Sequence, residues 1–159
     1  MKRVDIGSQQ VRDVMTFHAV AASPSDSVKD ALDLMVANRV LALPVVDDAN
    51  RCVGIISASD LLELAQERGE DIESFSVAEG LAYELLVEHF EHADFSDLTV
   101  QDAMTPTPIE IAPEDTLVEA ARVMVENEIH HLAVTERRRQ FLGILSSMDV
   151  LRALAESTA

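Results

Sequence analysis

Residues 54–62 read Gly-Ile-Ile-Ser-Ala-Ser-Asp-Leu-Leu, and residues 143–151 read Gly-Ile-Leu-Ser-Ser-Met-Asp-Val-Leu. The two stretches share Gly, Ile, Ser, Asp and a final Leu, and they lie 89 positions apart. The same offset aligns residues 11–62, the first repeat, with residues 100–151, the second repeat, without a gap and with 17 identical pairs. Self-similarity at one fixed offset indicates a tandem duplication of a unit of about 50 residues.

Each repeat carries the same order of predicted elements, β-α-β-β-α. Apolar residues at helical spacing over 28–35 predict a helix, for which Asp26 is a suitable N-cap. Two short apolar runs, 41–46 and 52–56, flank a polar turn and predict a β-hairpin that leads into a second helix. A short strand is expected near 19–21, after a loop that carries a Met-Thr pair, and the second repeat has counterparts of all these elements. Because one such unit is too small to bury a core alone, the two should pack together.

An acidic segment without a counterpart in either repeat separates the two. We place the first domain at residues 1–68, an acidic linker at residues 69–96 and the second domain at residues 97–159. The stretch 63–99 contains 11 acidic residues and a single basic one, so it holds most of the net charge of −17. A charge run of this kind is typical of a solvated surface.

A helix is predicted over residues 76–92 of this acidic stretch. Ser76 and Glu79 have the spacing of a capping box, and an apolar stripe follows them. Three interpretations remain open for its charge: a solvated helix that packs by one face, a docking surface for a basic partner, or an adaptation to high salt.

Length and composition exclude several classes of protein. The chain has 159 residues, 48% of them hydrophobic and 26% charged, which suits a packed globular protein. Its 29 acidic against 12 basic residues disfavour both nucleic acid and an anionic membrane surface as partners. We expect neither a membrane span nor a signal peptide. The single cysteine, Cys52, cannot form an internal disulfide, so we expect a cytoplasmic protein in which Cys52 is a core residue.

Three features of the first repeat are typical of one family: the Met-Thr pair, the sequence Leu-Pro-Val-Val-Asp at 43–47, and Gly-Ile-Ile-Ser-x-x-Asp at 54–60. Together with their recurrence at one offset, they make the chain resemble a pair of CBS domains, the arrangement called a Bateman module. The resemblance implies an α/β (α+β) fold in which two units pack sheet to sheet around a pseudo-twofold axis. It also implies a regulatory, non-enzymatic protein that senses a ligand for another protein, of unknown identity.

The same resemblance implies a ligand and an assembly. Family members bind adenosine compounds, such as AMP, ADP, ATP or S-adenosylmethionine, in two clefts between the units, and they often form homodimers. In this chain the implied ligand-binding positions include the Met-Thr threonines, Thr16 and Thr105. No covalently bound cofactor is expected.

Two Ser-Asp pairs are the candidate ribose contacts. Asp60 follows Ser57, and Asp149 follows Ser146, each where a strand ends and a helix begins. A carboxylate there can accept hydrogen bonds from both hydroxyls of a ribose, and the helix N-terminus offers N–H groups to phosphate. The alternative is that each Asp only caps its helix.

Two adjacent histidines distinguish the second repeat from the first. His130 and His131 precede its second strand, where the first repeat has Leu41 and Ala42. Family members with cationic residues here use them to reach phosphate, so we expect two unequal sites. Neighbouring residues of a strand point to opposite faces, so one of the two histidines would serve a given site. The sequence leaves open whether that site holds Asp60 or Asp149.

Other patterns give weaker hypotheses. His89 and His92 have helical spacing that could hold a divalent metal, although a third ligand is missing. A module that no longer binds ligand and acts through its acidic linker helix is another alternative. Three arginines, 137–139, occupy a predicted hairpin turn, either as a solvated turn or as an attraction for an acidic partner or a phosphate.

Overall fold

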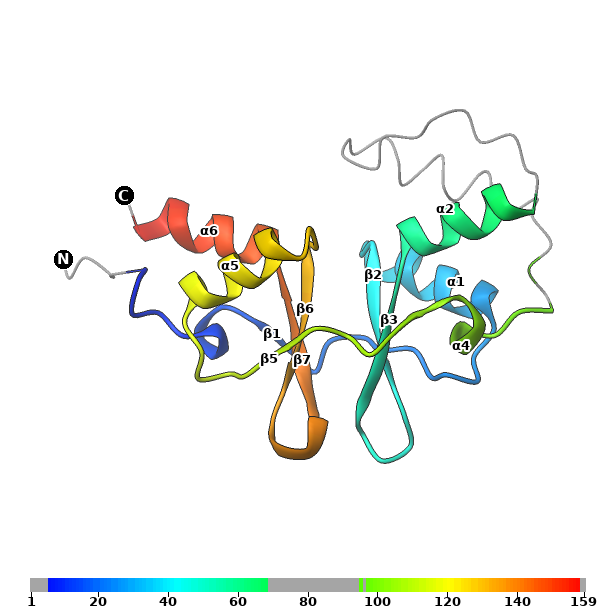
Figure 1. Cartoon of the computed structure of the whole chain (residues 1–159), viewed down its shortest axis with the longest axis horizontal. Helices are drawn as coiled ribbons and strands as arrows, with labels where there is room; N and C mark the ends of the chain where they lie inside the picture. The colour runs from blue at the N-terminus through cyan, green and yellow to red at the C-terminus, as the bar shows by residue number, and fades with distance from the viewer. Residues whose placement is uncertain (1–5, 69–94, 96, 158–159) are drawn as a thin grey trace. The chain divides into compact units, whose positions relative to one another are not determined.

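The computed structural model of the chain describes residues 6–68, 95 and 97–157 (Figure 1). They form two compact units, which we name after their candidate ribose-binding residues. The Asp149 unit consists of Met1–Ala19, Asn50–Cys52 and Pro108–Ala159, and the Asp60 unit consists of Val20–Ala49 and Val53–Thr107. Each unit therefore contains residues from both repeats.

The Asp60 unit has a three-stranded sheet with the strand order β2-β3-β4. Its strands are β2 (Ala42–Val46), β3 (Cys52–Ser57) and β4 (Thr105–Pro106), and its helices are α1 (Val28–Asn38), α2 (Ala58–Glu67) and α4 (Val100–Ala103). The apolar stripe predicted from the sequence fills its core, with Val28, Ala31 and Met35 buried against Leu43 and Ile56. At about 2 kcal/mol for each fully buried aliphatic side chain, this cluster is the main stabilising contribution to the unit.

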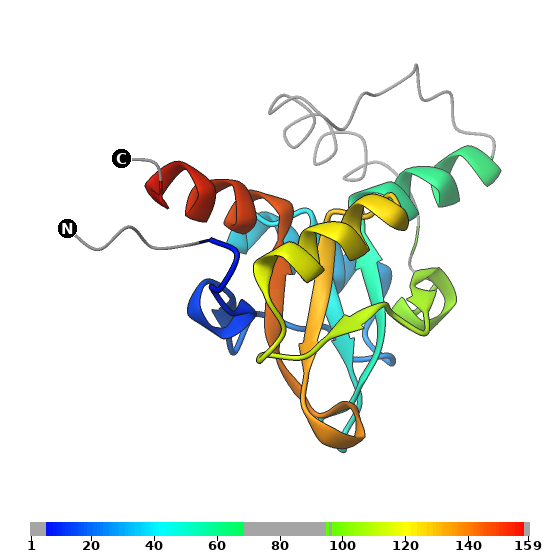
Figure 2. The ribbon, with the colours of Figure 1, turned by 60° about the vertical axis from the view of Figure 1, so that its left-hand side comes forward.

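The Asp149 unit has a four-stranded sheet with the order β1-β7-β6-β5. Its strands are β1 (Thr16–Phe17), β5 (Glu110–Ile111), β6 (His131–Thr135) and β7 (Phe141–Ser146), and its α-helices are α5 (Leu117–Glu126) and α6 (Ser147–Ser157). Two short 3-10 helices, Val11–Asp13 and Arg137–Arg139, complete it. Strand β5 runs parallel to β6, whereas β1 and β6 run antiparallel to β7. The turn of the β6–β7 hairpin lies at the end away from α5 and α6 (Figure 1 and Figure 2).

The Met-Thr segments are exchanged between the repeats. Strand β1 comes from the first repeat but pairs with β7 of the second, and β4 comes from the second repeat but pairs with β3 of the first. Glycine makes the close approach in both places. A Cβ on Gly54 would lie 2.5 Å from Met104 Sδ and 2.9 Å from the Thr105 carbonyl oxygen, and a Cβ on Gly143 would overlap the Thr16 carbonyl oxygen.

The predicted β-α-β-β-α order is confirmed, with two local differences. The Met-Thr segments form short strands rather than loops. The strand expected near 19–21 is reduced to an isolated parallel bridge between Ala22 and Val45. The predicted linker helix over 76–92 and nearly all of the linker 69–96 fall outside the described residues.

The helix starts correct the predicted N-caps by one position. Ser27, rather than Asp26, caps α1, and its Oγ accepts a hydrogen bond from the Asp30 N–H at 3.0 Å. Asp26 instead accepts from the Ser23 N–H at 2.8 Å and closes the preceding turn. Because Asp and Ser are equally good caps, adjacent candidates cannot be ranked by residue type.

Candidate functional site

Asp60 lies at the start of α2, where β3 ends. Ser57 is the N-cap, and Asp60 is the third helical residue, so the two form a capping box. Asp60 Oδ2 accepts hydrogen bonds from the Ser57 N–H at 2.7 Å and from Ser57 Oγ at 2.8 Å, and Ser57 Oγ accepts from the Asp60 N–H at 3.2 Å. Thr105 Oγ1, on the exchanged strand β4, donates to Asp60 Oδ1 at 3.1 Å. Three predicted site residues are thus brought together in this unit.

Asp149 occupies the equivalent place at the start of α6. Its Oδ2 accepts from the Ser146 N–H at 2.8 Å, and its own N–H donates to Ser146 Oγ at 3.1 Å. Its Oδ1 lies 3.5 Å from Nη1 of Arg152, one turn along α6. The carboxylate is only 16% exposed, whereas Arg152 is 66% exposed. Thr16, the counterpart of Thr105, lies on β1 of this unit opposite Ile144.

The capping alternative and the binding alternative therefore use different oxygens of the same carboxylate. In each unit Oδ2 is held by a backbone N–H at the helix start, which keeps the side chain in one orientation. Oδ1 has an exchangeable partner, the Thr105 hydroxyl in one unit and the Arg152 guanidinium in the other. A hydroxyl donor from a ligand could take the place of either partner at Oδ1.

The structure places the histidines with Asp149. His131 begins β6 and is the direct partner of Ser146 in the β6–β7 ladder, and the His130 carbonyl oxygen accepts from the Ser147 N–H at 2.9 Å. His131 is half-buried, whereas His130 is exposed. Burial lowers the pKa of His131, the neighbouring His130 lowers it further, and the negative charge of Asp149 opposes both. Within its unit, His131 is thus a largely neutral imidazole at neutral pH.

A comparison of equivalent positions extends the contrast between the histidines and the first repeat to a further residue, Arg152. Arg152 corresponds to Glu63 of the first repeat, and His131 corresponds to Ala42. The start of α6 therefore carries cationic or titratable nitrogen groups where the start of α2 carries an additional carboxylate. Aligning the two repeats position by position would have identified Arg152 as a candidate residue.

The metal hypothesis rests on residues that the structure does not describe, since His89 and His92 belong to the segment 69–94. Within residues 6–68, 95 and 97–157, no group of three or more His, Cys, Asp or Glu side chains is arranged to hold a metal ion. Over the same residues, none of the helices has both the length and the apolar character needed to cross a membrane.

Comparison with known proteins gives a consistent family. The sequence profile described as CBS domain matches residues 11–67 and again residues 100–156. The CBS domain-containing protein CBSX2, chloroplastic, from Arabidopsis thaliana is 32% identical over 160 residues, which cover 92% of this chain and 64% of that protein. The 5'-AMP-activated protein kinase subunit gamma-3 of Bos taurus is 29% identical over 129 residues, 81% of this chain and 22% of that subunit. The chain thus spans less than two thirds of the length of these relatives.

Solved structures agree with the sequence comparison. The crystal structure of CBSX2 in complex with AMP matches with a TM-score of 0.72 at 31% identity, and the match covers 95% of this chain and 99% of that chain. A second structure of CBSX2, described as a CBS-pair protein, matches with a TM-score of 0.74.

Proposed function

This chain belongs to the CBS-domain family, and on that premise we propose that it is a regulatory module that binds an adenosine compound and relays its presence to another protein. The observation that carries the proposal is the pair of capped carboxylates, Asp60 and Asp149, each held by one oxygen and open to exchange at the other. The crystal structure of the relative CBSX2 with AMP supports an adenine nucleotide as the ligand. S-adenosylmethionine remains the second candidate ligand.

We assign the ribose hydroxyls to Oδ1 of the two carboxylates. In the Asp60 unit a ribose hydroxyl would replace Thr105 as the donor, and Thr105 would then be free to turn toward the ligand. In the Asp149 unit it would replace Arg152, which would free a guanidinium for the phosphate. Ser57 and Ser146 would hold the carboxylates in place, and Thr16 would line the Asp149 site in the position that Thr105 has at Asp60.

The two sites are proposed to be unequal. Arg152 gives the Asp149 unit a positive charge for a phosphate, and His130 and His131 add imidazole N–H groups that can donate to it. Glu63 and Ala42 stand at the corresponding positions of the Asp60 unit. We therefore assign the stronger contact with a nucleotide phosphate to the Asp149 unit.

Titration calorimetry on the purified chain tests the proposed function directly. AMP, ADP, ATP and S-adenosylmethionine should be compared with adenosine, which lacks phosphate, and with GTP, which lacks adenine. We expect binding of at least one adenosine compound and none of GTP. A chain that binds none of them at millimolar concentration would contradict the proposal and would favour a pure protein-interaction module.

We also propose that the module is a homodimer. Helices α5 and α6 pack against each other and expose several large apolar side chains: Val118, Val125, Met148, Leu151 and Leu154. Clustered apolar residues on a surface are typical of a protein interface. At the corresponding positions of the first repeat, Lys29 and Ser59 are polar, and the remaining three are apolar but not exposed: Val36, Leu62 and Ala65. The exposed apolar residues are therefore specific to this helix pair.

A further inference from the structure

The turn of the β6–β7 hairpin carries three consecutive arginines, Arg137–Arg139, which we call the arginine turn. The equivalent turn of the first repeat has Asp48, Ala49 and Asn50 at these positions. The two turns thus differ in the sign of their charge, although they belong to copies of one unit. The chain has only 12 basic residues and a net charge of −17, so three adjacent arginines are a local concentration of positive charge.

The backbone of the arginine turn is unfavourable for arginine. Arg138 has φ 60° and ψ 30°, and Arg139 has φ 63°, so two successive residues with a Cβ adopt the left-handed region. Glycine and asparagine adopt this conformation more readily, and Asn50, the counterpart of Arg139, does so with φ 58°. Arginine thus occupies two successive positions that glycine or asparagine would fill at a lower backbone cost.

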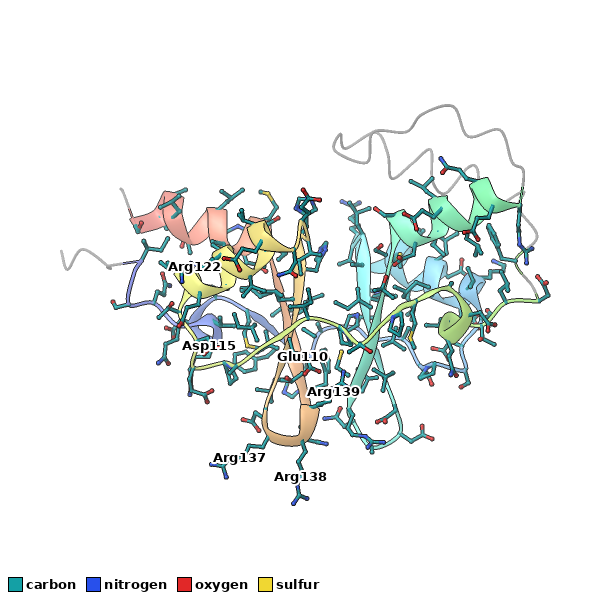
Figure 3. All side chains as sticks on the ribbon, viewed as in Figure 1. Glu110, Asp115, Arg122, Arg137, Arg138 and Arg139 are labelled. Carbon is teal, nitrogen blue, oxygen red and sulfur yellow. The ribbon has the colours of Figure 1, made fainter. Side chains whose placement is uncertain are left out.

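The three guanidinium groups have different environments. Arg139 Nε donates to Glu110 Oε1 at 3.1 Å, which ties the turn to β5. Arg137 and Arg138 point away from the sheet into solvent (Figure 3). Across the described part of the chain, neither of these two side chains forms an ion pair. Two positive charges are thus available at the end of the hairpin.

The turn is also held in a fixed shape. The Glu136 N–H donates to the Gln140 carbonyl at 2.8 Å, and the Arg139 N–H donates to the Glu136 carbonyl at 3.1 Å. Within the same unit, the Phe141 N–H donates to the Asn50 carbonyl at 2.9 Å, and a bridge joins Arg51 to Gln140. Arg51 therefore adds a fourth arginine beside the turn. A preorganised turn loses little entropy when it binds a partner.

We propose that the arginine turn is a docking point for a short acidic segment of a partner protein. Carboxylates accept paired hydrogen bonds from guanidinium groups, so each of the two exposed arginines can bind one carboxylate of an acidic peptide. A nucleic acid fits less well, because a few arginines neutralise few phosphates while the strongly negative chain repels the rest. The turn lies at the opposite end of β6 from His131, about 16 Å away for a five-residue strand, so docking there is separate from the proposed ligand site.

Fluorescence anisotropy on the full chain tests this proposal. The probe is a labelled peptide of about a dozen residues that alternates Glu and Ser, and the control probe replaces every Glu by Gln. At low salt we expect saturable binding of the Glu peptide alone, which weakens when salt screens the charges. Arg138→Gln should weaken it about threefold, and Arg137→Gln with Arg138→Gln about tenfold, as expected for exposed charge pairs. The matched control is Arg122→Gln, which removes one exposed arginine of α5, away from the turn (Figure 3).

Three outcomes would overturn the proposal. The first is no saturable binding of the Glu peptide at low salt. The second is an equal loss of binding in Arg122→Gln and Arg138→Gln, which would mean that net charge rather than the turn attracts the peptide. The third is an equally tight and equally turn-dependent binding of a single-stranded oligonucleotide, which would make the turn a general polyanion site. Circular dichroism of each variant confirms that the fold is retained.

Discussion

Asp60 has both carboxylate oxygens in use before any ligand arrives. Oδ2 is bound to Ser57, and Oδ1 accepts the hydroxyl of Thr105. A bound ribose must therefore compete with an existing hydrogen bond rather than fill an unsatisfied site. The net free energy of binding then comes from the second ribose hydroxyl and from the rest of the ligand. The affinity should therefore depend more on the negative charge of Asp60 than on its role as a helix cap.

The substitution Asp60→Asn separates these two roles. Asn retains one acceptor oxygen for the Ser57 N–H, and its amide can donate to Thr105, so the melting temperature should change little. A charge-assisted hydrogen bond to the ribose would be weakened, and affinity for AMP should fall about tenfold or more in calorimetry. Asp26→Asn is the matched control, because Asp26 accepts a similar bond from the Ser23 N–H in the same unit. Equal affinities of all three proteins would remove Asp60 from the site.

His131 should make folding stability depend on pH. Its pKa is lowered in the folded state, chiefly by burial, so below about pH 6.5 the unfolded state takes up a proton that the folded state does not. The free energy of unfolding should thus decrease as pH falls from 7.5 to 5, and His131→Gln should reduce that decrease. Urea unfolding at several pH values measures it. Parallel curves for both proteins would show that His131 does not titrate differently on folding.

The strain at Arg138 should be measurable as stability. Arg138→Asn places a residue that tolerates φ near 60° in the turn, and we expect stabilisation of roughly 0.5–1 kcal/mol. Arg137→Asn is the control, since that residue does not have positive φ. Thermal unfolding compares the two. If Arg138→Asn instead lowers the melting temperature, the guanidinium of Arg138 makes a stabilising contact, and the positive φ at this position is not a net cost to stability.

At the level of elements, Gly54 and Gly143 allow the exchanged strands β4 and β1 to lie close to β3 and β7. Gly54→Ala should push β4 away from β3, since the new methyl group would meet the Thr105 carbonyl, and the backbone cannot move aside as a side chain does. We expect a loss of roughly 1–3 kcal/mol in chemical denaturation. Adding Met104→Ala should restore only part of it, because it removes the contact with Met104 Sδ but not the one with the carbonyl. Full stability of Gly54→Ala would mean that β4 is not closely packed there.

The sequence predicted the elements whose pattern of apolar residues extends over several positions. The stripe of Val28, Ala31 and Met35 predicted α1, and the two apolar runs around a polar turn predicted the hairpin. Strands β1 and β4 have two residues each, too few for any alternation, so their exchange between repeats could not be predicted. The partner strand of each depends on where a glycine allows two backbones to lie close together, and this is visible only in the folded structure.

The candidate site was predictable in its residue types but not in its contacts. Ser57 and Asp60 were identified from one motif, yet the motif could not tell which oxygen would remain exchangeable. The Thr105–Asp60 bond depends on the exchanged strand and so was out of reach. Placing His131 with Asp149 required the β6–β7 register, which the hairpin length alone did not determine.

For the whole molecule, the exposed apolar face of α5 and α6 predicts self-association. Val125 is 77% exposed and Leu151 is 54% exposed, and both belong to the group of exposed apolar side chains on this helix pair. Light scattering at micromolar concentration should give the mass of a dimer, and Val125→Asn with Leu151→Asn should shift it toward the monomer. Val20→Asn, an exposed apolar position of the Asp60 unit, is the control. A monomeric native protein would contradict the proposal.

The exchange of β1 and β4 also affects how the chain folds during synthesis and whether it can be cut into two folded fragments. During synthesis the Asp60 unit lacks its third strand until residue 106 has left the ribosome, and β1 must wait for β7 before it has a partner. A cut between the repeats would leave each fragment without one strand of its own sheet and with one strand that belongs to the other. Neither repeat should therefore fold on its own, because each sheet needs a strand from the other repeat of the same polypeptide.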